Sequence, residues 1–262
     1  MKQRIITALA LASIAIFMIF YSEGTFKLLM FVLSMISCIE IWTLNKNRYF
    51  IGIPVLMFIT IFISVSTSLV AQIAWLSIYF LIATLIHLTD ERFRLIDLFL
   101  SFVIVFIISM AINGLTTVYQ LGGPIAILWI FIANFMTDTG AYFVGSWFGK
   151  RKLNERLSPK KTVEGAIGGW IFSFMISLIF GLVVFDGQLS SNFIIVTSLV
   201  IPITAQVGDF FFSSIKRVYN IKDFGNLFPG HGGMLDRIDS LLFSAFAVNL
   251  LLILWGVLVW IS

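Results

Sequence analysis

Three aspartates in the C-terminal part of the chain are placed as the ligands of a metal ion would be. Asp236 and Asp239 are three residues apart, so on one turn of helix they point to the same side. Asp209 lies near the end of an earlier apolar run and can meet them if the two runs pack side by side. Mg²⁺ in proteins is usually held by one or two carboxylates, while water and substrate phosphates complete its coordination shell. We therefore predict that Asp209, Asp236 and Asp239 bind Mg²⁺.

The basic residues and glycines around these aspartates are typical of a phosphate site. Asp209, Ser213 and Lys216 fall at i, i+4 and i+7, which places them on one stripe of a helix. Positive charge suits a polyanion, and glycine lets backbone N–H groups approach phosphate oxygens. A simple intrahelical salt bridge is the alternative interpretation of the stripe. The predicted phosphate-binding residues are Ser213, Lys216, Arg217, Lys222, His231, Gly232, Gly233 and Arg237.

A second polar segment lies upstream, inside another apolar run. Asn134, Asp138 and Tyr142 recur every four residues and so share one helical face. An ionisable group at membrane depth costs about 2.5–3.5 kcal/mol on insertion scales, and it marks a functional site by default. The alternative is a polar seam that holds neighbouring helices together, because several nearby glycines permit close approach of another backbone.

The composition indicates an integral membrane protein of all-α fold. The 262 residues are 60% hydrophobic and only 11% charged, whereas soluble domains carry about 25% charged residues. Cys38 is the sole cysteine, which excludes an intramolecular disulfide and a cysteine metal cluster. The net charge of +4 is explained by lysines and arginines in cytoplasmic loops, so we expect a lipid bilayer and no nucleic acid as partner.

Nine apolar runs predict nine transmembrane helices with the N-terminus in the cytoplasm. Of the 17 lysines and arginines, only Lys27 then falls on the outer side, as the positive-inside rule requires. Residues 1–120 would form about five N-terminal spans, and residues 121–262 the catalytic region with cytoplasmic loops 146–164 and 214–239. The loops on the outer side, including 114–122, are short. The runs lie near 5–22, 26–44, 49–67, 69–88, 97–114, 123–145, 165–185, 192–213 and 240–261.

Two further ionisable residues fall within or at the edge of these runs. Glu40 has no obvious local partner, so a hydrogen bond between packed helices and a role in the site remain equal alternatives. His87 lies at the end of a run, before Asp90, where an interfacial position explains it best.

Two blocks of the sequence resemble the phosphatidate cytidylyltransferases, also called CDP-diacylglycerol synthases. The downstream block contains Ser213-x-Ile215-Lys216-Arg217, Lys222-Asp223 and Pro229-x-His231-Gly232-Gly233-x-x-Asp236-Arg237-x-Asp239. The upstream block contains Asp138-x-x-Ala141-Tyr142-Phe143-x-Gly145, Phe148-Gly149 and Ser158-Pro159-x-Lys161-Thr162-x-Glu164-Gly165. Over residues 1–120 the resemblance extends only to the number of hydrophobic spans.

The resemblance implies that CTP and phosphatidate are converted to CDP-diacylglycerol and pyrophosphate. It also implies Mg²⁺, a second cation such as K⁺, a place in the cell (inner) membrane and an active site that faces the cytoplasm. A homodimer is a further expectation. Ser158 and Lys161 would approach the nucleotide or lipid phosphate, Lys216 would act in catalysis, and Asp138, Tyr142 and Glu164 would support the site.

Other functions fit parts of the same pattern. A CTP-dependent polyprenol or lipid-alcohol kinase would use similar phosphate groups but would release CDP in place of pyrophosphate. A cation-coupled transporter would use the intramembrane carboxylates, although it has no reason to gather phosphate-binding groups on one side. A CDP-alcohol phosphotransferase is disfavoured because its Asp-Gly-x-x-Ala-Arg core is missing from this chain.

Overall fold

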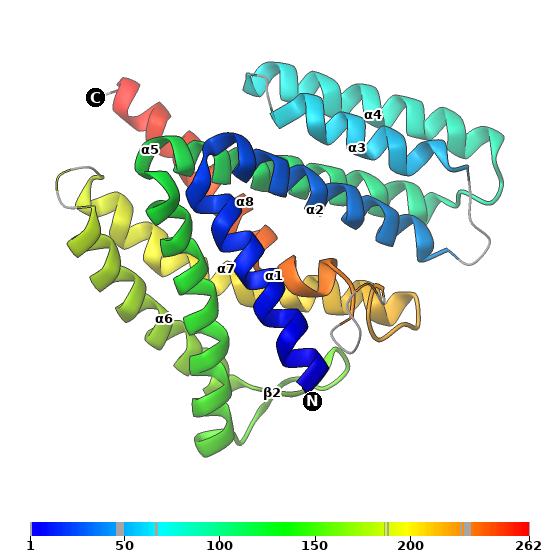
Figure 1. Cartoon of the computed structure of the whole chain (residues 1–262). Coiled ribbons are helices and arrows are strands. Elements are labelled where there is room, and N and C mark those ends of the chain that lie inside the picture. The colour runs from blue at the N-terminus through cyan, green and yellow to red at the C-terminus, as the bar shows by residue number, and fades with distance from the viewer. Residues whose placement is uncertain are drawn as a thin grey trace. The chain divides into compact units, whose positions relative to one another are not determined.

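The computed structural model of the chain describes residues 2–45, 50–65, 68–185, 187, 189–225, 227 and 232–261. One predicted site residue, His231, lies outside the described residues. The chain forms helices almost throughout, as its long apolar runs predict (Figure 1).

The helices follow the expected apolar runs closely, with one exception described below. They are α1 (Lys2–Tyr21), α2 (Glu23–Thr43), α3 (Gly52–Val65), α4 (Leu69–Thr89), α5 (Leu95–Phe148), α6 (Val163–Val184), α7 (Ser191–Val218) and α8 (Leu235–Ile261). A short antiparallel hairpin, β1 (Lys152–Asn154) and β2 (Ser158–Thr162), lies between α5 and α6. The all-α prediction therefore holds for the apolar segments, and the hairpin is an addition that the sequence did not indicate.

Six of the described helices are long and apolar enough to cross a membrane, so the chain is a multi-pass membrane protein. One of them, α5, has 54 residues, or about 80 Å at 1.5 Å per residue, which is ample for two crossings of a hydrocarbon core of about 30 Å. Two shorter apolar helices occur at Ala12–Tyr21 and Gly52–Val65. The number nine and the orientation of the N-terminus stay predictions.

The expected loop at 114–122 is wrong, because these residues are helical within α5. The change of direction is confined to Gly123, whose φ of 64° and ψ of −161° lie outside the helical region. Only glycine adopts this conformation readily, and Pro124 directly after it has a φ that suits the first turn of a new helix. A single Gly-Pro step therefore does what the sequence pattern assigned to a loop.

The chain divides into two compact units, each described here by itself. The first contains residues 1–113 and 219–237, and the second contains residues 114–218 and 238–262. The predicted division near residue 120 is not tested by this grouping. The grouping does show that a stretch of the downstream signature, 219–237, folds together with the N-terminal helices.

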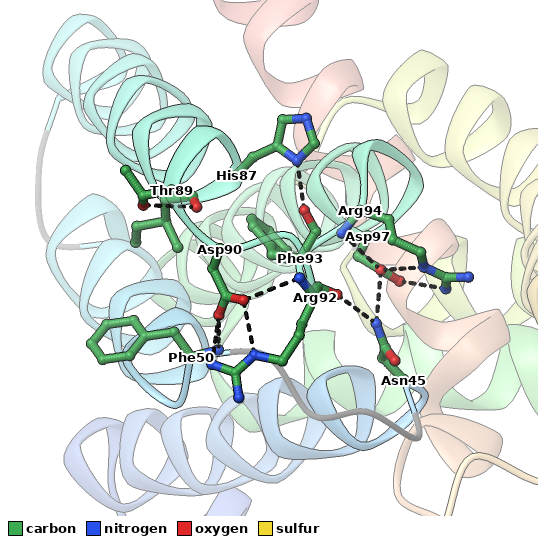
Figure 2. A network of polar contacts seen from close by, with 10 residues as sticks. Asn45, Phe50, His87, Thr89, Asp90, Arg92, Phe93, Arg94 and Asp97 are labelled. Atoms are coloured by element: carbon green, nitrogen blue, oxygen red, sulfur yellow. Dashed lines mark hydrogen bonds and ion pairs between the residues drawn. The ribbon is translucent and has the colours of Figure 1, made fainter.

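In the first unit, a polar network organises the connection between α4 and α5 (Figure 2). Asp90 accepts hydrogen bonds from the backbone of Phe50 and from the guanidinium of Arg92. The hydrogen bond from the Arg92 side chain is the main reason that the pKa of Asp90 falls to about 2. His87 places its Nδ1 2.5 Å from the carbonyl oxygen of Phe93 at the end of α4, which gives this histidine a structural contact.

In the second unit, small residues bring α5 and α6 into close contact. A Cβ built on Gly169 would lie 2.5 Å from the carbonyl oxygen of Thr137, and one on Gly165 would lie 2.8 Å from that of Ala141. The Ser173 hydroxyl adds a 2.6 Å hydrogen bond to a carbonyl of α5. This packing agrees with the polar-seam interpretation of the upstream segment, and it also fixes the end of α6 that carries the hairpin.

The Gly123 step gives a direct test of the fold. We expect Gly123→Ala to destabilise the protein by about 1–3 kcal/mol, because a residue with a Cβ is strained at this φ and ψ. Gly256→Ala is the matched control, since a Cβ there meets open space in a helix and helix interiors favour alanine by about 0.5–1 kcal/mol. Thermal unfolding of both variants in the same detergent would measure the difference, and equal Tm values would contradict this account of the break.

Candidate active site

The stripe predicted on α7 is present, and it is joined by a residue from the hairpin. Ser213 lies one turn after Asp209, and its hydroxyl donates a 3.5 Å hydrogen bond to the Asp209 carboxylate. The other oxygen of Asp209 forms an ion pair with the ammonium of Lys161 on β2. The second unit therefore brings together residues of both predicted blocks, although they are far apart in the sequence.

The Lys161 ammonium lies at a point where charges from several elements meet. The carboxylates of Asp138 on α5 and Asp239 on α8 attract it, whereas Lys216 repels it. It also lies 5.0 Å from the centre of the Phe210 ring, within cation–π range. Burial lowers the pKa of Lys161 below its usual value, and the two carboxylates oppose that effect.

A cavity of about 330 Å³ opens beside this ion pair. Its polar lining comes from α5, the hairpin and α7, so these elements together form one pocket. Lys161 and Asp138 both line the pocket, which puts a cation and a carboxylate on the same small volume. The polar lining side chains include Asp138, Tyr142, Ser146, Lys160, Lys161 and Gln206.

The hairpin is fixed at both ends by residues that were predicted as part of the site. The Glu164 carboxylate accepts hydrogen bonds from the backbone N–H groups of Lys150 and Arg151, at 3.0 and 3.1 Å. At the other end, Arg217 donates a 3.3 Å hydrogen bond to the carbonyl of Leu157. Glu164 thus holds one end of the hairpin and Arg217 the other, while the roles predicted for them in the site stay predictions.

The first unit contains the rest of the downstream signature. Asp236 accepts hydrogen bonds from the backbone N–H groups of Phe224 (2.7 Å) and Gly233 (3.0 Å). Gly232 has a φ of 85°, which is readily adopted only by glycine, so this residue is required for the turn. The phosphate-binding roles predicted for Gly232, Gly233, Lys222 and Arg237 stay predictions.

The predicted Mg²⁺ site stays a prediction, and the structure allows a check only of whether the chemistry of the residues fits the ion. Among the described residues, no three His, Cys, Asp or Glu side chains are grouped as a metal site. Within the second unit, however, the carboxylates of Asp209, Asp138 and Asp239 all act on one cation, the Lys161 ammonium. Carboxylate oxygens that already attract a cation are the donors that Mg²⁺ prefers, so the residues present fit the ion. Asp236 belongs to the other unit, and its part in the site stays a prediction.

Comparison with known proteins agrees with this arrangement of residues. A family model described as the cytidylyltransferase family matches residues 2–255. The chain belongs to the cytidylyltransferase family. The phosphatidate cytidylyltransferase of Bacillus subtilis (strain 168) is 31% identical over 93% of this chain and 94% of its own length. Those of Staphylococcus haemolyticus (strain JCSC1435) and Staphylococcus aureus (strain COL) are also 31% identical, over 97% of this chain and 99% of their own lengths.

The family resemblance predicted from the two motif blocks is thereby confirmed, and it extends over the N-terminal spans as well. In this cytidylyltransferase, sequence reasoning missed Gln206 and Lys160, which line the cavity. A signal for Gln206 was available, because it lies one turn before Asp209 on α7 and extends the same polar stripe. Lys160 carried no such signal, since a second lysine in a basic loop is what the positive-inside rule already produces.

The lowered pKa of Lys161 predicts an alkaline limit to the activity of the cytidylyltransferase. As pH rises through this pKa, the ammonium is lost at a lower pH than for an ordinary lysine, whose pKa is about 10.4. We therefore expect kcat/KM, which reports the ionisations of the free enzyme, to fall as the pH rises through the pKa of Lys161. This fall is the alkaline limb of the pH profile. In Lys161→Arg the guanidinium stays charged, so the limb should disappear, while kcat/KM near neutral pH drops roughly tenfold through a poorer fit.

The matched control for this measurement is Lys152→Arg, because Lys152 is exposed on β1 and outside the cavity. Its pH profile should coincide with that of the unmodified protein. An alkaline limb that persists unchanged in Lys161→Arg would assign the titration to another group.

Proposed function

We propose that the chain transfers CMP from CTP to phosphatidate, releasing pyrophosphate and forming CDP-diacylglycerol for phospholipid biosynthesis. The family supports this function, as do the relatives named phosphatidate cytidylyltransferase that match over nearly their whole length. The observation that carries it is the ion pair between Lys161 of the upstream block and Asp209, which also accepts a hydrogen bond from Ser213 of the downstream block. A reaction between two phosphate-bearing substrates needs a cation such as Lys161, because their negative charges repel each other.

The chemistry requires positioning and charge neutralisation more than proton transfer. A phosphatidate oxygen attacks the α-phosphorus of CTP, a new P–O bond forms, and the bond to the pyrophosphate group breaks. The attacking phosphate is already ionised, so no strong general base is needed. Bound Mg²⁺, with Asp209, Asp236 and Asp239 as its proposed ligands, would supply positive charge at the reacting phosphates.

The basic residues of the chain have a defined task in this scheme. Lys161 and Lys216 face the same small region, where their charges would screen the two substrates from each other and stabilise the departing pyrophosphate. When a phosphate replaces Asp209 as the partner of Lys161, the carboxylate becomes free to bind a metal ion. The ion pair would then be the resting arrangement of a site whose charges are exchanged when substrate binds.

The surface beside the cavity suits a lipid substrate. An apolar groove of about 450 Å³ adjoins the cavity beside Lys161, and the two share Leu153, Ala166 and Gln206. Trp170 and Phe210 contribute aromatic surface to the groove. A molecule with a charged head and acyl chains matches this continuity, since its phosphate can reach Lys161 while its chains stay on apolar surface.

The experiment that tests the function is an assay of the purified protein with labelled CTP, Mg²⁺ and phosphatidate. Stoichiometric CDP-diacylglycerol and pyrophosphate are the expected products. Release of CDP with a phosphorylated lipid alcohol would instead identify the lipid-alcohol kinase. Repeating the assay with K⁺ omitted tests the proposed second cation, and the mass of the active particle tests the homodimer.

The same assay tests the carboxylates. We expect Asp209→Asn, Asp236→Asn and Asp239→Asn to lower kcat by about a hundredfold or more, because even a partner that only orients a metal ligand is worth about 10- to 100-fold. Asp223→Asn is the control and should be mild, since we assign Asp223 to the loop and not to the metal. Near-normal turnover in Asp209→Asn or Asp239→Asn would refute the metal assignment.

The proposed orientation places the hairpin in the cytoplasm, where CTP is found. Asn154 precedes α6 in the sequence and Ser190 follows it, so cysteines introduced at these two positions should face opposite sides of the membrane. The natural Cys38 is buried and should not react. An impermeant thiol reagent added to intact cells should label the cysteine at 190 and leave that at 154 unmodified. Labelling at 154 from outside would reverse the orientation.

A further inference from the structure

The segment 219–237 connects α7 to the first turn of α8 and carries much of the downstream signature. Lys222, Gly232, Gly233 and Asp236 all lie within it. In the structure this segment is grouped with the N-terminal helices, where the sequence left open whether Glu40 has a role in the site. Two buried carboxylates from those helices contact the described parts of the segment, one near each end.

Glu40 on α2 holds the end of the segment where α8 begins. Its two carboxylate oxygens accept hydrogen bonds from the backbone N–H groups of Met234 (2.7 Å) and Leu235 (2.9 Å). These N–H groups belong to a helix start, where no intrahelical acceptor exists and where a negative charge is favourable. Glu40 is only 6% exposed, so the contact is well shielded from water.

The backbone of the signature lies directly against this carboxylate. A Cβ built on Gly233 would lie 2.5 Å from Oε1 of Glu40, and one on Gly225 would lie 2.8 Å from the same atom. Asp236 completes the turn from the other side, because it accepts hydrogen bonds from Gly233 and Phe224. Glu40 and Asp236 thus bind consecutive N–H groups, and the position of Asp236 depends on the place that Glu40 gives to this turn.

Asp97, in the first turn of α5, holds the opposite end of the segment. It accepts a 2.6 Å hydrogen bond from the hydroxyl of Tyr219, the first residue after α7. Asp97 is 3% exposed and is fixed by Arg94 and Asn45, as Figure 2 shows. Burial raises the pKa of Tyr219, and the bond to Asp97 raises it further, so the hydroxyl stays protonated as a donor.

We propose that Glu40 and Asp97 are positioning residues of the cytidylyltransferase, which hold both ends of segment 219–237 so that Asp236 and Lys222 are correctly placed for the substrates. The catalytic part of this proposal rests on the proposed function. The N-terminal helices are then part of the catalytic machinery through these two carboxylates, in addition to their role as membrane spans. Neither residue touches the reacting atoms.

Glu40→Gln is the first test, because it keeps the shape of the side chain and removes one of the two acceptors. We expect amide hydrogen exchange at Met234 and Leu235 to accelerate at least tenfold, while exchange in α6 stays unchanged. The kcat should fall roughly ten- to a hundredfold, the worth of one hydrogen bond to a charged group, with KM for both substrates within about threefold. Glu23→Gln is the matched control on the same helix, where Glu23 forms an ion pair with Lys27, four residues away.

Tyr219→Phe and Asp97→Asn test the other end by a double-mutant cycle. Tyr219→Phe keeps the ring and removes only the hydroxyl, whereas Asp97→Asn also weakens the contacts of Asp97 with Arg94 and Asn45, so Asp97→Asn should lower kcat more. Adding Tyr219→Phe to Asp97→Asn should cause little further loss, because the hydroxyl has already lost its charged partner. Asp90→Asn is the control, because Asp90 belongs to the same polar network as Asp97 but forms its hydrogen bonds with Arg92 and the backbone of Phe50.

Unchanged exchange at Met234 and Leu235 in Glu40→Gln, or a kcat equal to that of Glu23→Gln, would overturn the proposal for Glu40. Fully additive losses in the double variant would overturn it for Asp97. If Glu40→Gln fails to fold, Glu40→Asp and the Tyr219→Phe cycle decide the question. A wild-type protein that makes no CDP-diacylglycerol would refute the proposed function, whereas the exchange measurement would still test whether Glu40 holds the turn.

Discussion

The ion pair between Lys161 and Asp209 is the interaction on which the candidate site depends. Charges in an apolar protein are costly unless opposite charges or hydrogen-bond donors face them. Here the ammonium from the hairpin satisfies the carboxylate of α7, and Asp138 and Asp239 add further attraction. In the proposed function, the same electrostatic requirement that stabilises the free protein would also prepare the site for its substrates, because a phosphate would take the place of Asp209 and a metal ion that of Lys161.

This pairing is possible only because the backbone around it is closely packed and firmly held. Glycines on α6 let it approach α5 to within contact of main-chain atoms, and Thr162, with its side chain accepting from Gly165, starts α6 directly after the hairpin. Glu164 and Arg217 then fix the hairpin from two sides. Small residues that looked like a polar seam in the sequence therefore serve the site by setting where Lys161 can reach.

Buried carboxylates do similar work in the first unit with backbone groups as partners. Glu40 and Asp97 are buried away from water, so each accepts its hydrogen bonds from N–H or O–H groups of the protein. For Glu40, the two alternatives left open by the sequence merge, since its hydrogen bonds join helices and also support the signature turn. A membrane protein with few charges uses them where they fix backbone position most effectively.

The sequence by itself determined the membrane character, most of the helices, the family and the stripe of Asp209 and Ser213, because these follow from composition and from spacing along one helix. It did not determine the hairpin, the helical course of 114–122, the pairing of Lys161 with Asp209 or the contact of Glu40 with Met234. In a pattern of apolar residues, a helix break at one Gly-Pro step cannot be told from a short loop. The spacing of residues along one helix also does not indicate which faces of two helices pack together. Those contacts join residues far apart in the chain, so only the tertiary structure, through the close packing of small residues and the need to satisfy buried charges, decided them.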